Sequence, residues 1–441
     1  MGQFARADEN ESGKGAAATQ TPKELSATAE RIFDKARPRL LQIRTLLKSA
    51  RKQSSIGSGF LVGEDGRAVT NYHVVSQFAL EPDLYQIEYT VADGARGQLK
   101  LLAIDVANDL AVVQLDAPPG KRFGAFEFDS AAVRGVMVKG ERLFSLGNPL
   151  DLGFTIVEGT YNGMVDKSYQ KHVHFTGAIN PGMSGGPVVT VDNRIAGINV
   201  ARNIGNDLVS FLVPASAAVR LLERTVTSGE LDAPTVRKEI GAQMALWQKD
   251  FFAALKTRGF HEAELGPYRV AESNADWFNC WARTNRDERS KLRALVNHSR
   301  CDTRTHLFLA GDMSAGEVAI SHMYLKSVDL GPVQFAQRLT QAAHPRLPGG
   351  DGNRYTPFRC YENFLAPDSE SPSRPELRVA WCARAYKDFA ELYDVSFVSI
   401  TQDSDREALV SSALLTGVHF ENALSFTQDF LAALKVRRDL D

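Results

Sequence analysis

A chain of 441 residues exceeds the size that one hydrophobic core usually supports, so the sequence predicts two folding units, the second of them internally duplicated. Hydrophobic residues make up 44%, charged residues 24%, and the formal net charge is -2, a balance that excludes a strongly basic nucleic-acid-binding protein. No apolar run reaches the roughly 18 residues of a membrane-spanning helix, so we expect no membrane span.

The N-terminal segment contains few large apolar side chains. Residues 1–21 therefore predict a disordered arm, and they lack the apolar core of a signal peptide. Apolar side chains at helical spacing predict a helix over 23–37, which Pro38 ends.

Short apolar runs separated by turn residues occupy the next part of the chain, from Leu40 to about Val213. Many short strands with Gly, Asp-Gly and Asn turns are typical of an all-β barrel or sandwich. A short helix follows, and residues 225–234 indicate a linker between a first unit over 22–224 and a second over 235–441. In the second unit, three amphipathic helices alternate with strand-like segments, which predicts an α+β domain.

All four cysteines lie in the second unit. Their two nearly equal short spacings favour two disulfides, Cys280 with Cys301 and Cys360 with Cys382, each closing one copy of a repeated hairpin. The alternatives are a zinc site, although the sequence contains no C-x-x-C pair, and four reduced core cysteines. Disulfides indicate a periplasmic or secreted protein, whose signal peptide we expect to be missing from this sequence.

The segment NPGMSGGPVV contains a candidate nucleophile, Ser184. Amide hydrolysis needs a nucleophile, a base, a group that orients the base, and donors for the developing oxyanion. Gly182 and Gly185 permit a sharp turn and close approach of a substrate. In such a turn the N–H groups of Gly182 and Ser184 can converge to form an oxyanion hole.

Two earlier segments supply the other groups. The hairpin GSGFLVGEDGRAV leads to a short turn that presents His73, and IDVANDLAVVQL places Asp109 before an apolar strand. Each residue alone suits an ordinary polar position or a cap. Their occurrence together, in this order with Ser184, favours a catalytic triad.

The segments TNYHVV, DVANDLAVVQL, GNPLDLGFTIVEGT and AINPGMSGGPVV resemble, in this order, the HtrA/Deg-type branch of the trypsin-like serine proteases. The resemblance covers about residues 28–224 and implies a chymotrypsin-like double barrel. It also implies His73, Asp109 and Ser184 as the triad, with Gly182 as an oxyanion donor. The chain departs from the family at Met183, where asparagine is usual, and in lacking a PDZ pattern.

Two other interpretations have less support. GMSGG fits the nucleophile elbow of α/β-hydrolases, but the next segment indicates two strands rather than the required helix. His172 and His174 alternate on an expected strand and could hold a metal, but no cysteine or carboxylate is evidently paired with them. We expect no metal and no cofactor.

The resemblance also implies which residues line the substrate pocket. These lie in the segments TGAINPG and GINVAR and carry no acidic side chain, so we expect small or medium apolar substrate residues before the cleaved bond. The pocket candidates are Thr176, Ala178, Ile179, Ile198 and Val200.

These features together predict a serine endopeptidase, active in protein quality control, that cleaves unfolded or exposed polypeptides through an acyl-enzyme on Ser184. The alternative is a chaperone-like or scaffold protein whose main function resides in residues 235–441. The sequence does not indicate an oligomeric state.

Overall fold

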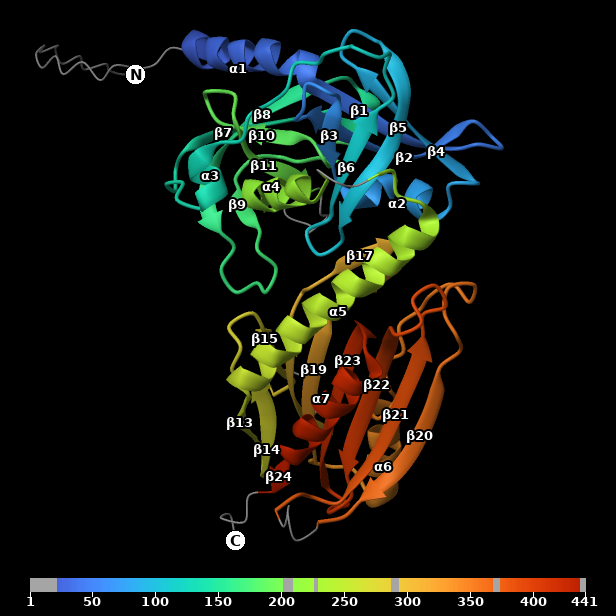
Figure 1. Ribbon diagram of the computed structural model, residues 1–441. Helices are drawn as coiled ribbons and strands as arrows, with labels where there is room; N and C mark the ends of the chain where they lie inside the picture. Colours follow the sequence, from blue (N-terminus) through green and yellow to red (C-terminus); the bar gives the residue numbers. More distant parts are fainter. Residues whose placement is uncertain (1–21, 201–208, 226–228, 287–292, 368–372, 437–441) are drawn as a thin grey trace, which may run out of the picture.

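The computed structural model describes residues 22–200, 209–225, 229–286, 293–367 and 373–436 (Figure 1). The upper part of the molecule in this view contains two β-barrels, and the lower part contains a large sheet with helices. The long helix α5 (Ala233–Arg258) runs from the first part into the second.

The first barrel is a closed, antiparallel sheet with the order β1-β2-β3-β6-β5-β4. The pairing of β1 with β4 closes it. Helix α1 (Pro22–Ala36) and the short 3-10 helix η1 (Arg37–Arg39) precede the barrel, and α2 (Tyr72–Leu80) joins β3 to β4. The strands are β1 (Leu40–Leu47), β2 (Lys52–Leu61), β3 (Arg67–Thr70), β4 (Tyr85–Val91), β5 (Arg96–Asp105) and β6 (Leu110–Leu115).

The second barrel is closed in the same way, with the order β10-β11-β12-β9-β8-β7. Helices α3 (Ser130–Arg134) and α4 (Ala215–Arg224) lie outside it, and the short 3-10 helix η2 (Pro149–Asp151) joins β7 to β8. The strands are β7 (Arg142–Gly147), β8 (Thr155–Met164), β9 (Val173–Phe175), β10 (Pro187–Val189), β11 (Ile195–Val200) and β12 (Ser210–Pro214).

A buried apolar cluster joins the two barrels. Phe60, Val69 and Leu110 of the first barrel pack with Phe144 and Ile198 of the second, and all five are fully buried. The two closed six-stranded barrels confirm the double-barrel architecture predicted for this part of the chain.

The C-terminal unit is built on a seven-stranded sheet with the order β15-β16-β19-β23-β22-β21-β20. A three-stranded sheet, β13-β14-β24, and a two-stranded one, β17-β18, lie beside it, and α6 (Pro332–Ala342) and α7 (Phe420–Ala432) pack on it. The strands are β13 (Phe260–Leu265), β14 (Tyr268–Ser273), β15 (Asn279–Thr284), β16 (Ala294–Asp302), β17 (Leu307–Ala310), β18 (Met313–Ala315), β19 (Val318–Ser327), β20 (Arg359–Leu365), β21 (Leu377–Ala385), β22 (Tyr393–Thr401), β23 (Glu407–Val418) and β24 (Lys435–Val436).

Alternation along β22 explains why helices cover both faces of this sheet. Phe397 packs against Phe430 of α7, with the ring centroids 5.2 Å apart. The next residue, Val398, points to the opposite face and packs in a cluster with Phe335 of α6. A strand that is apolar at successive positions is therefore buried on both sides.

Two disulfides connect neighbouring strands at the two outer edges of the seven-stranded sheet. Cys280 of β15 is bonded to Cys301 of β16, and Cys360 of β20 is bonded to Cys382 of β21. In each pair the two cysteines lie directly opposite each other in the strand register. These are the two pairs that the cysteine spacing predicts.

The C-terminal unit packs on the first barrel through a shared apolar cluster. Val236 and Ile240 of α5 and Leu309 of β17 belong to the same cluster as Leu101 and Val113 of the barrel. Polar contacts accompany it, because Gln243 of α5 donates to the Ile104 carbonyl at 2.8 Å and accepts from the Val106 N–H at 2.7 Å.

The end of the predicted linker takes part in this packing. The Leu231 N–H donates to the Leu101 carbonyl at 2.8 Å, and α5 begins at Ala233 after the N-cap Asp232.

No helix in the described part of the chain is both long enough and apolar enough to cross a bilayer.

Candidate active site

Ser184 lies in the loop between β9 and β10, at the junction of the two barrels, and only 3% of its surface is exposed. Two hydrogen bonds hold this loop on β2 of the first barrel. The Ser58 N–H donates to the Ser184 carbonyl, and the Ser58 hydroxyl donates to the Gly182 carbonyl, both at 2.7 Å. The first barrel therefore positions a serine that belongs to the second.

Gly185 allows the serine loop to approach the segment before His73. Its φ of +82° lies in the region that favours glycine. A Cβ atom at this position would lie 2.5 Å from Thr70 Oγ1 and 2.7 Å from the Asn71 nitrogen, closer than real contacts permit. A side chain at Gly185 would therefore separate the serine loop from the start of α2.

Gly57 of β2 lies between the same two segments. A Cβ atom there would lie 2.5 Å from Val74 Cγ2 and 3.0 Å from the Ser184 carbonyl oxygen. Because Val74 directly follows His73, the backbone of β2 brings the serine loop and the first turn of α2 to the same place.

The peptide groups around Ser184 are closely packed. Gly182 has a φ of +94°, and a Cβ atom there would lie 2.5 Å from the Asn148 carbonyl oxygen. The N–H groups of Met183, Gly185 and Gly186 donate to protein carbonyls, each at 3.0 Å. Within the described ranges the Gly182 N–H donates to no protein oxygen, so it can donate to an oxygen of another molecule.

Met183, where this chain departs from the HtrA/Deg-type pattern, is fully buried. It packs beneath Gly147 of β7, where a Cβ atom would lie 2.8 Å from the Met183 Cα. The unusual residue therefore faces the protein interior.

His73 is the second residue of α2, so it lies in a helix, whereas the sequence predicts a short turn. The helix begins directly after β3, and Asp109 holds its first turn. The Tyr72 N–H and the Asn71 side-chain amide donate to the Asp109 carbonyl at 3.1 and 2.7 Å. Asp109 has a φ of +54°, a conformation that asparagine and aspartate tolerate better than most residues.

Both carboxylate oxygens of Asp109 contact His73. Oδ1 accepts the His73 backbone N–H at 2.9 Å, and Oδ2 lies 2.6 Å from Nδ1 of the imidazole. An ionised carboxylate only accepts hydrogen bonds, so it favours the tautomer with the proton on Nδ1. This tautomer leaves Nε2 as the proton acceptor of the ring.

A cavity of about 680 Å³ opens beside this pair. The first barrel contributes His73, Asp109, Val106 and Asn108, and the second barrel contributes residues between Val165 and His172 together with Val200 and Phe211. Its remaining wall belongs to the C-terminal unit and consists of Asn279, Thr303, Arg304, His306 and Phe308.

The predicted pocket residues have different environments. Ile198 and Val200 both belong to the buried cluster between the barrels, and Val200 also lines the cavity. Thr176 is exposed and accepts a hydrogen bond from the Asn162 amide at 2.6 Å. Ala178 and Ile179 are half-buried in the segment before the serine loop.

His172 and His174 both lie near the ring of Phe211, with centroid distances of 6.2 and 6.5 Å. His172 also lines the cavity beside His73. Across the described ranges no group of three or more His, Cys, Asp or Glu side chains is arranged to hold a metal ion.

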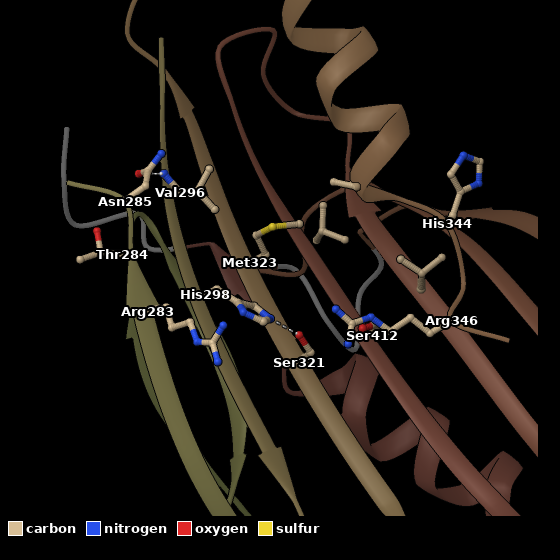
Figure 2. Close-up of a pocket in the computed structure, with 13 residues that line it drawn as sticks. Arg283, Thr284, Asn285, Val296, His298, Ser321, Met323, His344, Arg346 and Ser412 are labelled. Carbon is tan, nitrogen blue, oxygen red and sulfur yellow. Dashed lines mark hydrogen bonds between the residues drawn. The ribbon is translucent and has the colours of Figure 1, made fainter. Parts of the chain in front are cut away.

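A second cavity, of about 380 Å³, lies on the C-terminal sheet, and no residue of either barrel lines it (Figure 2). His298 and Ser321 face each other in it, with Nε2 and Oγ 2.7 Å apart. Burial, together with the positive charges of Arg346 and Arg283, lowers the pKa of His298. This cavity is therefore separate from the one beside His73.

The double barrel matches a known protein family. Residues 57–198 match the family described as trypsin-like peptidase domain. Over these residues the chain is similar to trypsin-like peptidase domains. The match contains His73, Asp109 and Ser184, and the resemblance of the sequence to the HtrA/Deg-type branch is confirmed over this part.

Relatives of the peptidase domain include the probable periplasmic serine endoprotease DegP-like of Brucella suis, 32% identical over 206 residues that cover 45% of this chain and 37% of that protein. The putative serine protease HhoB of Synechocystis is 28% identical over 218 residues, which cover 47% of this chain and 48% of that protein. The crystal structure of Deg5 is 24% identical, has a TM-score of 0.40, and is matched over 46% of this chain and 96% of that one. The chain thus spans less than half the length of these two curated relatives.

Proposed function

We propose that the protein is a serine endopeptidase in which Ser184 is the nucleophile, His73 the general base and Asp109 the residue that orients the base. The contact of both Asp109 oxygens with His73 carries this proposal, because such a contact fixes both the position and the tautomer of the imidazole. The packing of Gly57 and Gly185 between the serine loop and the start of α2 supports the placement of Ser184 at the same site.

The chemistry follows from this arrangement. Nε2 of His73 takes the hydroxyl proton as Ser184 Oγ attacks the substrate carbonyl carbon. The N–H groups of Gly182 and Ser184 stabilise the negative oxygen, and the bond from the Ser58 hydroxyl to the Gly182 carbonyl holds the intervening backbone. The imidazolium then gives its proton to the leaving amine, and water, activated by the same base, hydrolyses the acyl-enzyme.

We further propose that the substrates are unfolded or exposed polypeptides and that the protein works outside the cytoplasm. The two disulfides support an oxidising compartment. The Brucella relative, described as a probable periplasmic serine endoprotease, supports the same location.

For the chain as a whole, we propose a peptidase domain over 22–224, a linker over 225–234, and an α+β domain over 235–441 that arose by internal duplication. The hairpins β15-β16 and β20-β21 support the duplication, because they lie at opposite edges of one sheet. Each hairpin also carries a disulfide between directly opposed residues.

The test compares the intact protein with Ser184→Ala on a denatured protein substrate and with a fluorophosphonate that reacts with activated serines. The matched control is Ser130→Ala, at an exposed serine that begins α3. We expect cleavage and labelling in the wild type and the control, and neither in Ser184→Ala. Cleavage that persists in Ser184→Ala would refute the proposed mechanism.

A further inference from the structure

The wall that the C-terminal unit adds to the cavity beside His73 is formed mainly by the segment that leads into β17. Side chains alternate along this segment. Leu307 and Leu309 are buried in the cluster shared with the first barrel, whereas Arg304 and His306 are exposed and Phe308 is half-buried. The last three side chains line the cavity. The side chains on one face of β17 thus anchor the segment, and those on the other face point toward the proposed active site.

Two contacts fix the position of this wall. The Tyr72 hydroxyl donates to the Leu309 carbonyl at 2.8 Å, and the ring of Tyr72 is fully buried. The Phe308 ring meets Tyr72 and His73 edge-to-face, with centroid distances of 6.0 and 6.1 Å. The first two residues of α2 therefore both contact the Phe308 ring.

Phe308 shares the cavity with other apolar side chains. Val106, Val200 and Phe211 line the same cavity. Its charged groups include both signs, since Asp166 and Lys167 also line it. Arg304 is held by its own unit, because its guanidinium lies 4.3 Å from the Trp281 ring centroid and its Nε lies 3.8 Å from Asp302.

We propose that Phe308 is a specificity-determining residue and that the C-terminal unit completes a substrate subsite. This proposal rests on the proposed peptidase function. An apolar side chain of the substrate, at one fixed position relative to the cleaved bond, packs against Phe308 while the bond lies at Ser184. A cavity that is lined by the base and by an aromatic ring favours such a side chain by burying its surface.

The size of the side chain at Phe308 should then set the size of the substrate residue. Cleavage-site profiling on a denatured protein, followed by kcat/KM for matched peptides, compares the wild type with Phe308→Ala and Phe308→Leu. In Phe308→Ala the preference should shift from medium to large apolar residues at that one position, changing the ratio of kcat/KM values by about tenfold. Phe308→Leu should lie between the two, and the effect should appear mainly in KM.

The matched control is Phe364→Ala, on the outermost strand β20, where the phenylalanine is 68% exposed. This variant should retain the wild-type profile. Fluorophosphonate labelling of Ser184 should also stay unchanged in Phe364→Ala. If Phe308→Ala does not fold, the change in substrate preference of Phe308→Leu tests the proposal.

Three results would overturn the proposal. An unchanged profile in Phe308→Ala and Phe308→Leu would make the contact with His73 purely structural. An equal gain on every peptide would make Phe308 an obstruction rather than a subsite. Cleavage that persists in Ser184→Ala would refute Ser184 as the nucleophile, and with it the active site that the subsite is proposed to serve; that failure is distinguished because it arises in a variant that retains Phe308.

Discussion

Replacing Asp109 by asparagine changes one acceptor oxygen into a donor without altering the size of the side chain. Oδ1 of the new residue can still accept the His73 backbone N–H, as the carboxylate does at 2.9 Å. The amide nitrogen would then occupy the place of Oδ2, 2.6 Å from Nδ1 of His73. Because that amide only donates hydrogen bonds, the imidazole must carry its proton on Nε2, where the proposed mechanism needs an acceptor.

The expected loss of kcat is about 10⁴-fold, equivalent to about 5.5 kcal/mol of transition-state stabilisation. Stability should change much less. Both hydrogen bonds to His73 can form in the other tautomer, so the free energy of unfolding should fall by no more than about 1 kcal/mol. A large loss of activity with little loss of stability is the signature of a tautomer effect.

The assay measures kcat on a peptide substrate alongside urea unfolding of the same preparations. The matched control is Asp166→Asn, because Asp166 lines the same cavity and belongs to the second barrel. It should leave kcat within a few-fold of the wild type. If Asp109→Asn retained more than about a tenth of the wild-type kcat, the proposed role of Asp109 would be wrong.

Four further outcomes are expected. Ser184→Ala should reduce kcat by about 10⁶-fold in a peptide assay while circular dichroism stays unchanged, because the variant keeps the backbone bonds of the loop. Burial lowers the pKa of His322 to about 4, below the 6.5 of an exposed histidine, so the unfolded chain binds more protons between these values. The free energy of unfolding should therefore fall by about 3 kcal/mol from pH 7 to pH 4, and urea titrations of His322→Gln should show a smaller fall; parallel curves for the two proteins would contradict this assignment. Replacing Cys280 and Cys301 by serine opens a loop with a sequence separation of 21 and should cost about 3 kcal/mol in denaturant unfolding; an unchanged midpoint would refute that estimate. Cleavage sites mapped by mass spectrometry should follow alanine, valine or leucine, and predominant cleavage after lysine or arginine would reveal an acidic group in the pocket.

Local sequence patterns predicted the triad candidates, the strands of the barrels and the disulfides. Glycines on both sides of Ser184, a histidine that follows a hairpin, and an aspartate before an apolar strand are each recognisable within a few residues. Alternating apolar runs and turn residues likewise predicted the strands of both barrels. The cysteine spacing predicted both disulfides, because each pair lies on two neighbouring strands of one hairpin.

Other features depend on contacts between distant segments. Ile198 and Val200 share one face of a strand and one buried cluster, yet Val200 also lines the cavity and Ile198 does not, and no local pattern distinguishes them. Phe308 lies in an ordinary apolar run, LFLA, which indicates only a strand. Its place beside His73 follows from the packing of α5 and β17 on the first barrel. Local sequence patterns do not predict that packing.

The apolar cluster that extends from the first barrel into the C-terminal unit has a consequence for the order of events during synthesis. Chains are made from the N-terminus, and domains usually fold as units in that order. Here Tyr72 of the helix that carries His73 contacts the Phe308 ring and donates to the Leu309 carbonyl, and both of these residues are made after the strands of the two barrels. A nascent chain that ends before these residues lacks the contacts that they make with that helix. Residues made after both barrels would then decide when His73 reaches its final position, and the proposed peptidase would stay inactive until the chain has been extended through β17.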